Sequence, residues 1–216
     1  MAMEIEILWE NQDILVINKP AGMVVNRAES VGGETVQDWA DTKIRRYEDT
    51  NLGEDERLFK KRSGIAHRLD KETSGCLLIA KNPTALINLL GQFKERVVKK
   101  EYLALVHGRI SPASGTIRLP LHRSRFDREK WEIHYGGKVA QTSWKVEKYY
   151  GKFTLVRLFP LTGRTHQIRV HLSHLGYPIF ADEKYLSKNL RNEDRKRLSH
   201  HFLHAEKIGF ADLSGS

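Results

Sequence analysis

The stretch that decides the fold is His67-Arg68-Leu69-Asp70-Lys71-Glu72-Thr73-Ser74-Gly75, followed by the apolar run Cys76-Leu77-Leu78-Ile79-Ala80. A short apolar run is typical of a buried strand, and Gly75 before it indicates a tight turn. Asp70 and Arg68 thus stand at the edge of a core. A carboxylate beside an arginine in such a place is either a structural ion pair or part of a reactive site. The stretch by itself leaves both alternatives open.

The rest of the chain consists of short strands in sequential pairs, with a few helices between them. Apolar patterns predict strands at 5–9, 14–17, 23–25, 101–106, 142–149, 152–159 and 201–205. Helical spacing predicts helices after Thr35, Asn82 and Gly163. Residues 48–58 are polar and aperiodic, which predicts a surface loop. Residues 122–138 are basic and poor in aliphatic residues, which predicts a protruding hairpin or loop. Because the strand pairs are sequential, we expect an α+β fold with a mostly antiparallel mixed β-sheet, forming a single domain over 1–216.

Charge and composition limit the class of protein. The chain has 216 residues, with 36 Lys or Arg against 27 Asp or Glu, and a net charge of +9. This balance predicts attraction to polyanions, of which nucleic acid is the commonest. A solvated cationic surface would give the same balance. Hydrophobic residues make up 40% of the chain, which is enough for a sizeable core.

Nothing in the sequence predicts export or membrane insertion. The start Met-Ala-Met-Glu-Ile-Glu lacks the positive and apolar segments of a signal peptide. No apolar stretch approaches the roughly 20 residues of a membrane span. The single cysteine, Cys76, lies in an apolar run and is expected to be buried and unpaired. We therefore expect a soluble, cytoplasmic protein.

A second polar motif is Gly163-Arg164-Thr165-His166-Gln167-Ile168-Arg169. Small and polar residues open a helix here, and the free N–H groups of a helix start favour anions such as phosphate. A capped helix with a solvated basic end is the simpler interpretation. His166 and Arg169 are three residues apart and share a face. If an arginine came next to Asp70, it would lower the pKa of that carboxyl and keep it ionised.

Other chemistries find little support in the motifs. Six histidines invite a metal interpretation: His166, His171, His174, His200, His201 and His204. No Cys pair or carboxylate stands beside them at metal-ligand spacing, so we expect no metal. No Gly-x-Ser-x-Gly marks an acyl-transfer serine, and Asp70 and Glu72 need not converge as glycosidase carboxylates do. Asn18–Gly22 has one glycine and no Gly-Lys-Ser/Thr, so it is not a nucleotide-binding loop.

Four ordered blocks of the sequence resemble one known family. His67–Gly75 and Gly163–His171 are similar to the signature segments of the RluA-type pseudouridine synthases. Asn18–Gly22 and Lys100–Val106 match two further blocks, in the right order and at suitable spacing. The resemblance implies isomerisation of uridine to pseudouridine in rRNA or tRNA, with no cofactor and no metal. It also implies the pseudouridine synthase fold with a central basic cleft, and we expect a monomer.

The resemblance also implies roles for single residues. Asp70 falls on the family's catalytic aspartate, and Arg169 on the basic residue that pairs with it. Tyr102 falls on a tyrosine that stacks on the target base and is a candidate for moving the C5 proton. Arg68 falls on an arginine that fills the gap left by the target nucleotide, and Ile168 on an apolar position of the pocket. The other residues expected in the pocket or against RNA are Lys19, Arg164, His166 and Gln167.

Substrate selection and two rival functions complete the expectations. Many relatives carry a small N-terminal RNA-binding domain of the S4 type, which we do not expect here because Ile5–Ile17 already begins the catalytic domain. Selection of the RNA then rests on residues 48–62, 122–138 and 184–197. A non-catalytic RNA-binding protein with the same fold is the main alternative, and a hydrolase of a glycosidic bond is the third. The intact set Asp70, Tyr102 and Arg169 favours the enzyme.

Overall fold

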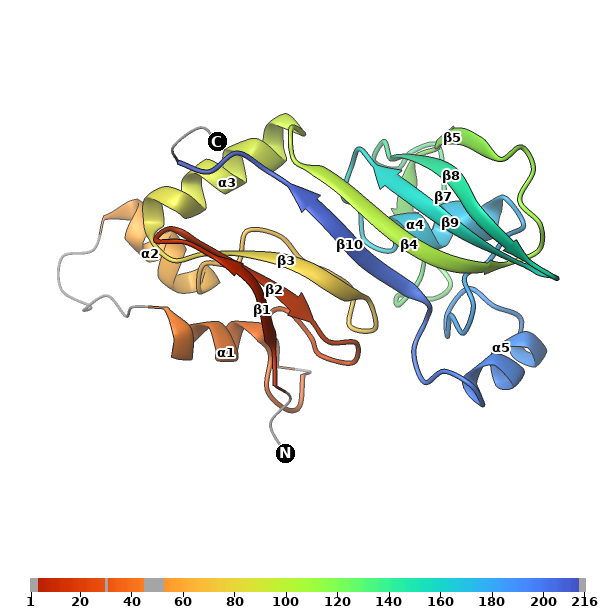
Figure 1. Ribbon diagram of the computed structural model, residues 1–216, viewed down its shortest axis with the longest axis horizontal. Helices are drawn as coiled ribbons and strands as arrows, with labels where there is room; N and C mark the ends of the chain where they lie inside the picture. The colour runs from red at the N-terminus through yellow and green to blue at the C-terminus, as the bar shows by residue number, and fades with distance from the viewer. Residues whose placement is uncertain (1–3, 30, 45–52, 214–216) are drawn as a thin grey trace. The chain divides into compact units, whose positions relative to one another are not determined.

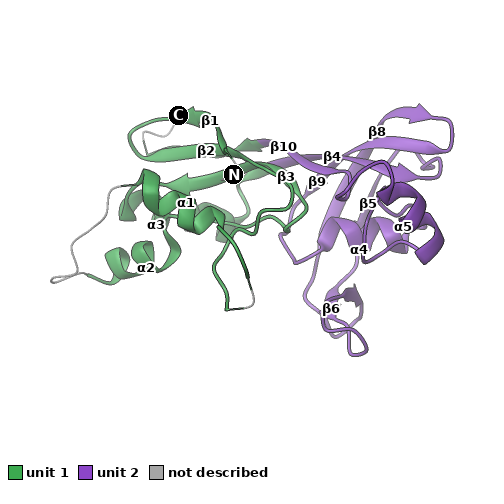
Figure 2. Ribbon diagram, turned by 90° about the horizontal axis from the view of Figure 1, so that it is seen from below, with its two compact units in different colours: residues 1–99, 208–216 green, residues 100–207 purple. Residues whose placement is uncertain are grey.

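The computed structural model describes residues 4–29, 31–44 and 53–213 (Figure 1). The chain divides into two compact units, which are coloured separately in Figure 2. Unit 1 comprises residues 1–99 and 208–216, and unit 2 comprises residues 100–207. Each unit is described by itself below. The expectation of a single domain, and that of a central basic cleft, stay predictions.

Unit 1 contains the strands β1 (Glu6–Glu10), β2 (Ile14–Lys19) and β3 (Ser74–Ala80), which pair antiparallel in that order. The apolar runs that predict strands at 14–17 and 76–80 lie side by side, because Ile14 is opposite Ala80 and Ile17 is opposite Leu77. Both runs are continuous rather than alternating, and all residues of both are buried. Continuous apolar runs are expected where a strand is covered on both faces.

The helices of unit 1 are α1 (Val36–Lys43), α2 (Glu54–Arg62) and α3 (Pro83–Glu95). The predicted caps are confirmed. Asn82 accepts a hydrogen bond from the N–H of Ala85 at 2.9 Å, and Thr35 caps α1 in a capping box. Phe59 of α2 and Leu86 and Leu89 of α3 share a core cluster with Ile14, Val16 and Leu78 of the strands.

Two sequence predictions in unit 1 are wrong. Residues 54–58 are not a loop but the start of α2, while residues 48–52 lie outside the described residues. The helix has an acidic first turn and a basic last turn, which complement its dipole, and a single buried apolar residue, Phe59. One anchor is too few to produce a visible helical period. Residues 23–25 form no strand, because the carbonyls of Val24 and Val25 accept hydrogen bonds from the first turn of α1.

Unit 2 is built on the strands β4 (Lys99–His107), β5 (Ser114–Arg118), β8 (Gln141–Tyr150), β9 (Phe153–Pro160) and β10 (Leu203–Gly209). They lie in the order β10-β4-β9-β8-β5. The β4–β9, β9–β8 and β8–β5 pairs are all antiparallel. The expected class, α+β with a mostly antiparallel sheet, is confirmed. The β8–β9 hairpin turns at Gly151, as predicted, whereas β5 was not predicted.

Helix α4 (Gln167–His174) connects two apolar clusters of unit 2. Its Ile168 and Leu172 pack with the buried residues of β4 and β9. Its Val170 packs with Leu121 and Ala140. Leu121 belongs to a second sheet, in which β6 (Leu121–Arg123) pairs with β7 (Trp131–Ile133). Residues 121–138, called the basic arm from here on, confirm the predicted hairpin. Helix α5 (Lys188–Arg195) follows in the charged segment 184–197.

Candidate active site

Asp70 lies on a tight turn that leads into β3. The N–H of Thr73 donates to the carbonyl oxygen of Asp70 at 3.1 Å, which closes the turn. Gly75, the second residue of β3, has a φ of 111°, a conformation that favours glycine. Leu69 and Thr73 are buried on either side, whereas Asp70 itself is partly exposed. Asp70 therefore stands on a hydrogen-bonded turn and is not fully buried.

His67 anchors the start of this stretch. Its Nε2 accepts a hydrogen bond from the N–H of Leu78, in the middle of β3, at 3.0 Å. A nitrogen that accepts this bond carries no proton. The imidazole ring also lies against Phe93 of α3, with ring centroids 4.7 Å apart. His67 thus ties the segment before Asp70 to the buried strand after it.

Lys19 holds the other side of the Asp70 turn. Its ammonium group donates to the carbonyl oxygens of Pro20, Met23 and Lys71 at 2.7, 2.8 and 3.1 Å. The N–H of Gly22 also donates to the carbonyl of Lys71 at 2.8 Å. These bonds hold the Asn18–Gly22 segment against the Asp70 turn. Lys19 and Lys71 are 52 residues apart in the sequence.

The expectation that Lys19 lies in the pocket or against RNA stays a prediction, and the structure gives its side chain a structural role. Its side chain is 0% exposed, and an ammonium has three donors, all of which are used on backbone carbonyls. Burial lowers the pKa of Lys19 to about 8, and the negative charge of Asp70 opposes this shift. Lys19 is a structural residue beside Asp70. Arg68, in contrast, is exposed, as a residue on the RNA side should be.

In unit 2, Tyr102 and Ile168 share one apolar cluster. Tyr102, on β4, is partly buried and packs against the cluster that contains Ile168, which is 7% exposed. Leu158 on β9 lies opposite Tyr102 and belongs to the same cluster. An aromatic ring with one face on an apolar wall suits the stacking role expected of Tyr102.

Arg169 forms a buried ion pair with Asp182. The guanidinium donates through two nitrogens to the two carboxylate oxygens, at 2.7 and 2.8 Å. Their side chains are 5% and 0% exposed. Burial raises the pKa of Asp182, but the hydrogen bonds and charge of Arg169 outweigh it and hold that pKa below its ordinary value. The pairing of Arg169 with Asp70 stays a prediction, because the two residues belong to different units.

Sequence reasoning missed Asp182. Its carboxylate also accepts hydrogen bonds from the N–H groups of Lys184 and Tyr185, at 2.9 and 3.1 Å. The available signal was its place directly after Ile179, Phe180 and Ala181, which are all buried. An acidic residue that follows an apolar run must find a cationic or N–H partner.

The remaining predicted residues of the Gly163–Arg169 motif divide between structure and surface. Gln167 is 4% exposed and uses its whole amide: its oxygen accepts from Thr162 and Arg164, and its nitrogen donates to Gln141 and Thr142. It therefore ties the motif to β8. The expectation that Gln167 lies in the pocket or against RNA stays a prediction. Arg164 is partly exposed and remains available to RNA.

His166 precedes α4 in the left-handed conformation, at a φ of 54°. Its Nδ1 lies 2.8 Å from the hydroxyl of Tyr185, and its side chain is only partly exposed. Left-handed backbone costs a residue with a side chain of the order of 1 kcal/mol and is found at functional sites. His166 is thus held at the start of the helix that carries Ile168 and Arg169.

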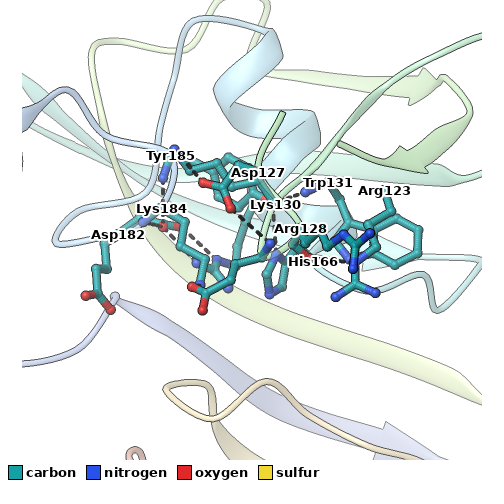
Figure 3. Close-up of polar contacts among 12 residues, drawn as sticks. Arg123, Asp127, Arg128, Lys130, Trp131, His166, Asp182, Lys184 and Tyr185 are labelled. Carbon is teal, nitrogen blue, oxygen red and sulfur yellow. Dashed lines mark hydrogen bonds and ion pairs between the residues drawn. The ribbon is translucent and has the colours of Figure 1, made fainter. Parts of the chain in front are cut away.

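The basic arm presents cations and aromatic rings to solvent. Phe126 is 98% exposed and Tyr135 is 90% exposed. The exposed cations of the arm are Arg123, Arg125, Arg128 and Lys138. The tip is internally bonded, since Arg123 donates to the carbonyl of Arg128 at 2.6 Å (Figure 3). Gly137 is required at the base, where an added Cβ would lie 2.4 Å from the carbonyl of Leu121.

Within the described ranges, no three His, Cys, Asp or Glu side chains gather so as to hold a metal ion. In the same ranges, no helix has the length and apolar character needed to cross a membrane. The expectations of no metal and no membrane contact stay predictions. Cys76 is buried, as expected, and is in no disulfide of the part of the chain that the structure describes.

Comparisons with known proteins place the chain. Residues 13–174 match the family described as RNA pseudouridylate synthase. The chain is 40% identical over 183 residues to an uncharacterized RNA pseudouridine synthase, YlyB, of Bacillus subtilis, covering 85% of this chain and 58% of that protein. It is 38% identical over 209 residues to ribosomal large subunit pseudouridine synthase C of Buchnera aphidicola, covering 94% of this chain and 62% of that protein. The chain thus spans about three fifths of the length of these relatives.

Solved structures agree with the sequence comparison. Human RNA pseudouridylate synthase domain containing 1 superposes with a TM-score of 0.74 at 29% identity, covering 98% of this chain and 80% of that chain. Human RNA pseudouridylate synthase domain containing 4 gives a TM-score of 0.70 at 26% identity, covering 94% of this chain and 83% of that chain. The matched family segment contains all the predicted site residues, from Lys19 to Arg169. The chain belongs to the RNA pseudouridylate synthase family.

Proposed function

We propose that this chain is the catalytic part of an RNA pseudouridine synthase, which isomerises uridine to pseudouridine with Asp70 as its catalytic residue. The observation that carries the proposal is the position of Asp70, a partly exposed residue on a turn held by Lys19 and Gly22. A reacting group needs such a combination of access and rigid support. The family match supplies the reaction type.

The reaction is an isomerisation and needs no external oxidant or reductant. The C1′–N1 bond of the nucleotide breaks, the uracil turns, and a C1′–C5 bond forms. The proton leaves C5 and a proton is gained at N1, so atoms and electrons balance. A carboxylate can serve by attacking the sugar or the ring, or by removing a sugar proton. Asp70 is the residue of this chain to which we assign one of these roles.

The target base must leave the RNA stack to reach Asp70. Extrusion of a base costs a few kcal/mol, and stacking on an aromatic ring returns about 1–3 kcal/mol. Tyr102 is the proposed stacking platform, since its ring lies on the cluster that contains Ile168. Its hydroxyl is the candidate for moving the C5 proton. Exposed Arg68 fills the gap left in the RNA.

Ribosomal RNA is the favoured substrate. The relatives with assigned names are ribosomal large subunit pseudouridine synthases, such as C of Buchnera aphidicola and D of Borreliella burgdorferi. Transfer RNA is the second candidate, on the family resemblance alone. A non-catalytic RNA-binding protein of the same fold remains the rival function.

A tritium-release assay tests the proposal. Large-subunit rRNA and tRNA transcripts carrying 5-³H-uridine are incubated with the protein, because a proton leaves C5 only if pseudouridine forms. We expect release from the rRNA. RNA binding without release from any RNA pool would overturn the enzyme and favour the binding protein. Free uracil among the products would favour a glycosidic hydrolase.

The basic arm is the proposed docking surface for the RNA strand beside the target. Aromatic rings interleaved with arginines bind single strands through stacking and phosphate contacts. Phe126→Ala is expected to weaken RNA binding about 10-fold, corresponding to one lost base stack. Filter-binding titrations measure this loss. Phe126→Trp keeps a stacking face and should restore the affinity.

The matched control for Phe126 is Tyr150→Ala, which removes another exposed aromatic ring of unit 2, at the end of β8. Its affinity for RNA should equal that of the wild type. The charge contribution is separable: Arg125→Gln should reduce the slope of log K against log salt by about 1, whereas Phe126→Ala should leave that slope unchanged. An unchanged affinity in Phe126→Ala together with an unchanged salt slope in Arg125→Gln would exclude the arm as a docking surface.

A further inference from the structure

Tyr185 joins the basic arm to the start of α4. Its hydroxyl oxygen accepts a hydrogen bond from the backbone N–H of Trp131, on β7 of the arm, at 2.9 Å (Figure 3). The same hydroxyl lies 2.8 Å from Nδ1 of His166. Trp131 and His166 are thus linked through a single oxygen atom. All three residues belong to unit 2.

One of these two hydrogen bonds has a fixed direction. The backbone N–H of Trp131 can only donate, so the hydroxyl oxygen of Tyr185 is the acceptor of that bond. In the contact with Nδ1 of His166, donor and acceptor are set by the tautomer of the imidazole. A shift of the arm that moves Trp131 displaces the oxygen on which the orientation of His166 depends.

Tyr185 also supports Arg169. Its ring lies under the guanidinium, with Cζ of Arg169 5.1 Å from the ring centroid. Its N–H donates to Asp182 at 3.1 Å, and Asp182 is the carboxylate that holds Arg169. The ring further packs in the cluster of Leu121, the first residue of the arm. One side chain thus contacts the arm, the residue before α4 and Arg169, which is expected to pair with Asp70.

We propose that Tyr185 is a positioning residue that couples the basic arm to α4, so that RNA seated on the arm sets His166 and Arg169 for the reaction. This inference rests on the proposed function. The hydroxyl of Tyr185 should contribute to the turnover rate and not to RNA affinity, because it is hydrogen-bonded inside the protein. The ring should contribute to the stability of the fold, because it packs in the apolar cluster and under Arg169.

The test is Tyr185→Phe, which deletes the hydroxyl and keeps the ring. We expect kcat on large-subunit rRNA to fall about 5- to 10-fold, as the loss of one hydrogen bond predicts, and KM to change less than about 2-fold. Tyr149→Phe is the matched control, because it deletes a hydroxyl that donates to the carbonyl of Ile110 at 2.9 Å in the same unit. That variant should lose a comparable amount of stability and keep its kcat. Equal kcat values for the two variants would overturn the inference.

A second measurement does not depend on activity. Hydrogen exchange of residues 167–174 is followed with and without a single-stranded oligouridylate. RNA should slow this exchange in the wild type and in Tyr149→Phe, but not in Tyr185→Phe. Identical protection in Tyr185→Phe would refute the coupling while leaving the proposed function intact. If RNA slows the exchange in a wild-type protein that releases no tritium, the synthase activity is refuted and the coupling through Tyr185 stands.

Discussion

Asp70→Asn is expected to abolish pseudouridine formation, lowering the single-turnover rate by about 10³-fold or more while RNA binding is retained. The amide has the shape of the carboxylate but cannot attack as an anion or accept the proton. Tritium release measures the rate, and filter binding measures the affinity. The assays are run at or below pH 7, because the charge of Asp70 raises the pKa of Lys19 and its removal lowers that pKa further.

Asp41→Asn is the matched control for Asp70→Asn. Asp41 is a carboxylate of the same unit, its side chain is 33% exposed, and it pairs with Arg27 at the surface. Its loss should leave the rate unchanged. If Asp70→Asn retained wild-type turnover, Asp70 would not be the catalytic residue. If that variant lost RNA binding as well, Asp70 would contribute to docking.

Arg169→Met is expected to lower the free energy of unfolding by about 3–5 kcal/mol, because it leaves the buried carboxylate of Asp182 without its cation. Asp182 is 0% exposed and accepts hydrogen bonds from Nε and Nη2 of the Arg169 guanidinium. Urea denaturation at pH 7 measures the loss. Arg157→Met is the control: Arg157 pairs with Glu101, Glu147 and Glu206, but its side chain is 23% exposed. The more exposed cluster should cost about 1 kcal/mol or less.

The loss in Arg169→Met should depend on pH in a defined direction. In the wild type, the pKa of Asp182 lies below its ordinary value. The ion pair therefore stabilises the folded protein at any pH above that ordinary value, and this stabilisation is lost as the pH falls through the lowered pKa. In Arg169→Met, burial, the largest influence on Asp182, is opposed only by the charge of His201 and the hydrogen bond from the N–H of Lys184, and we expect it to raise the pKa of Asp182. The variant then gains stability by protonation as the pH falls. The difference between the two proteins should therefore narrow from about pH 7 to about pH 4. A difference independent of pH would show that Asp182 is not the group left unpaired.

The sequence predicted the elements whose signals are local. The runs at 14–17 and 76–80 became the buried strands β2 and β3, because continuous burial leaves a continuous apolar pattern. Asn82 and Thr35 began helices because a cap acts over three residues. Helix α2 was missed because its only buried residue, Phe59, sets no period. The four blocks also identified the family, since their order and spacing are properties of the chain alone.

The site residues divide along the same line. The sequence by itself determined which residues fall on the family's motifs, Asp70, Tyr102 and Arg169 among them. Only the tertiary structure decided that Lys19 and Gln167 are buried ties, since their partners include residues 52 and 26 positions away in the chain. It also decided that Arg169 is paired with Asp182 and that Tyr185 joins the basic arm to α4. The physical reason is that a hydrogen bond depends on distance in space, and sequence patterns record only the neighbours along a helix or strand.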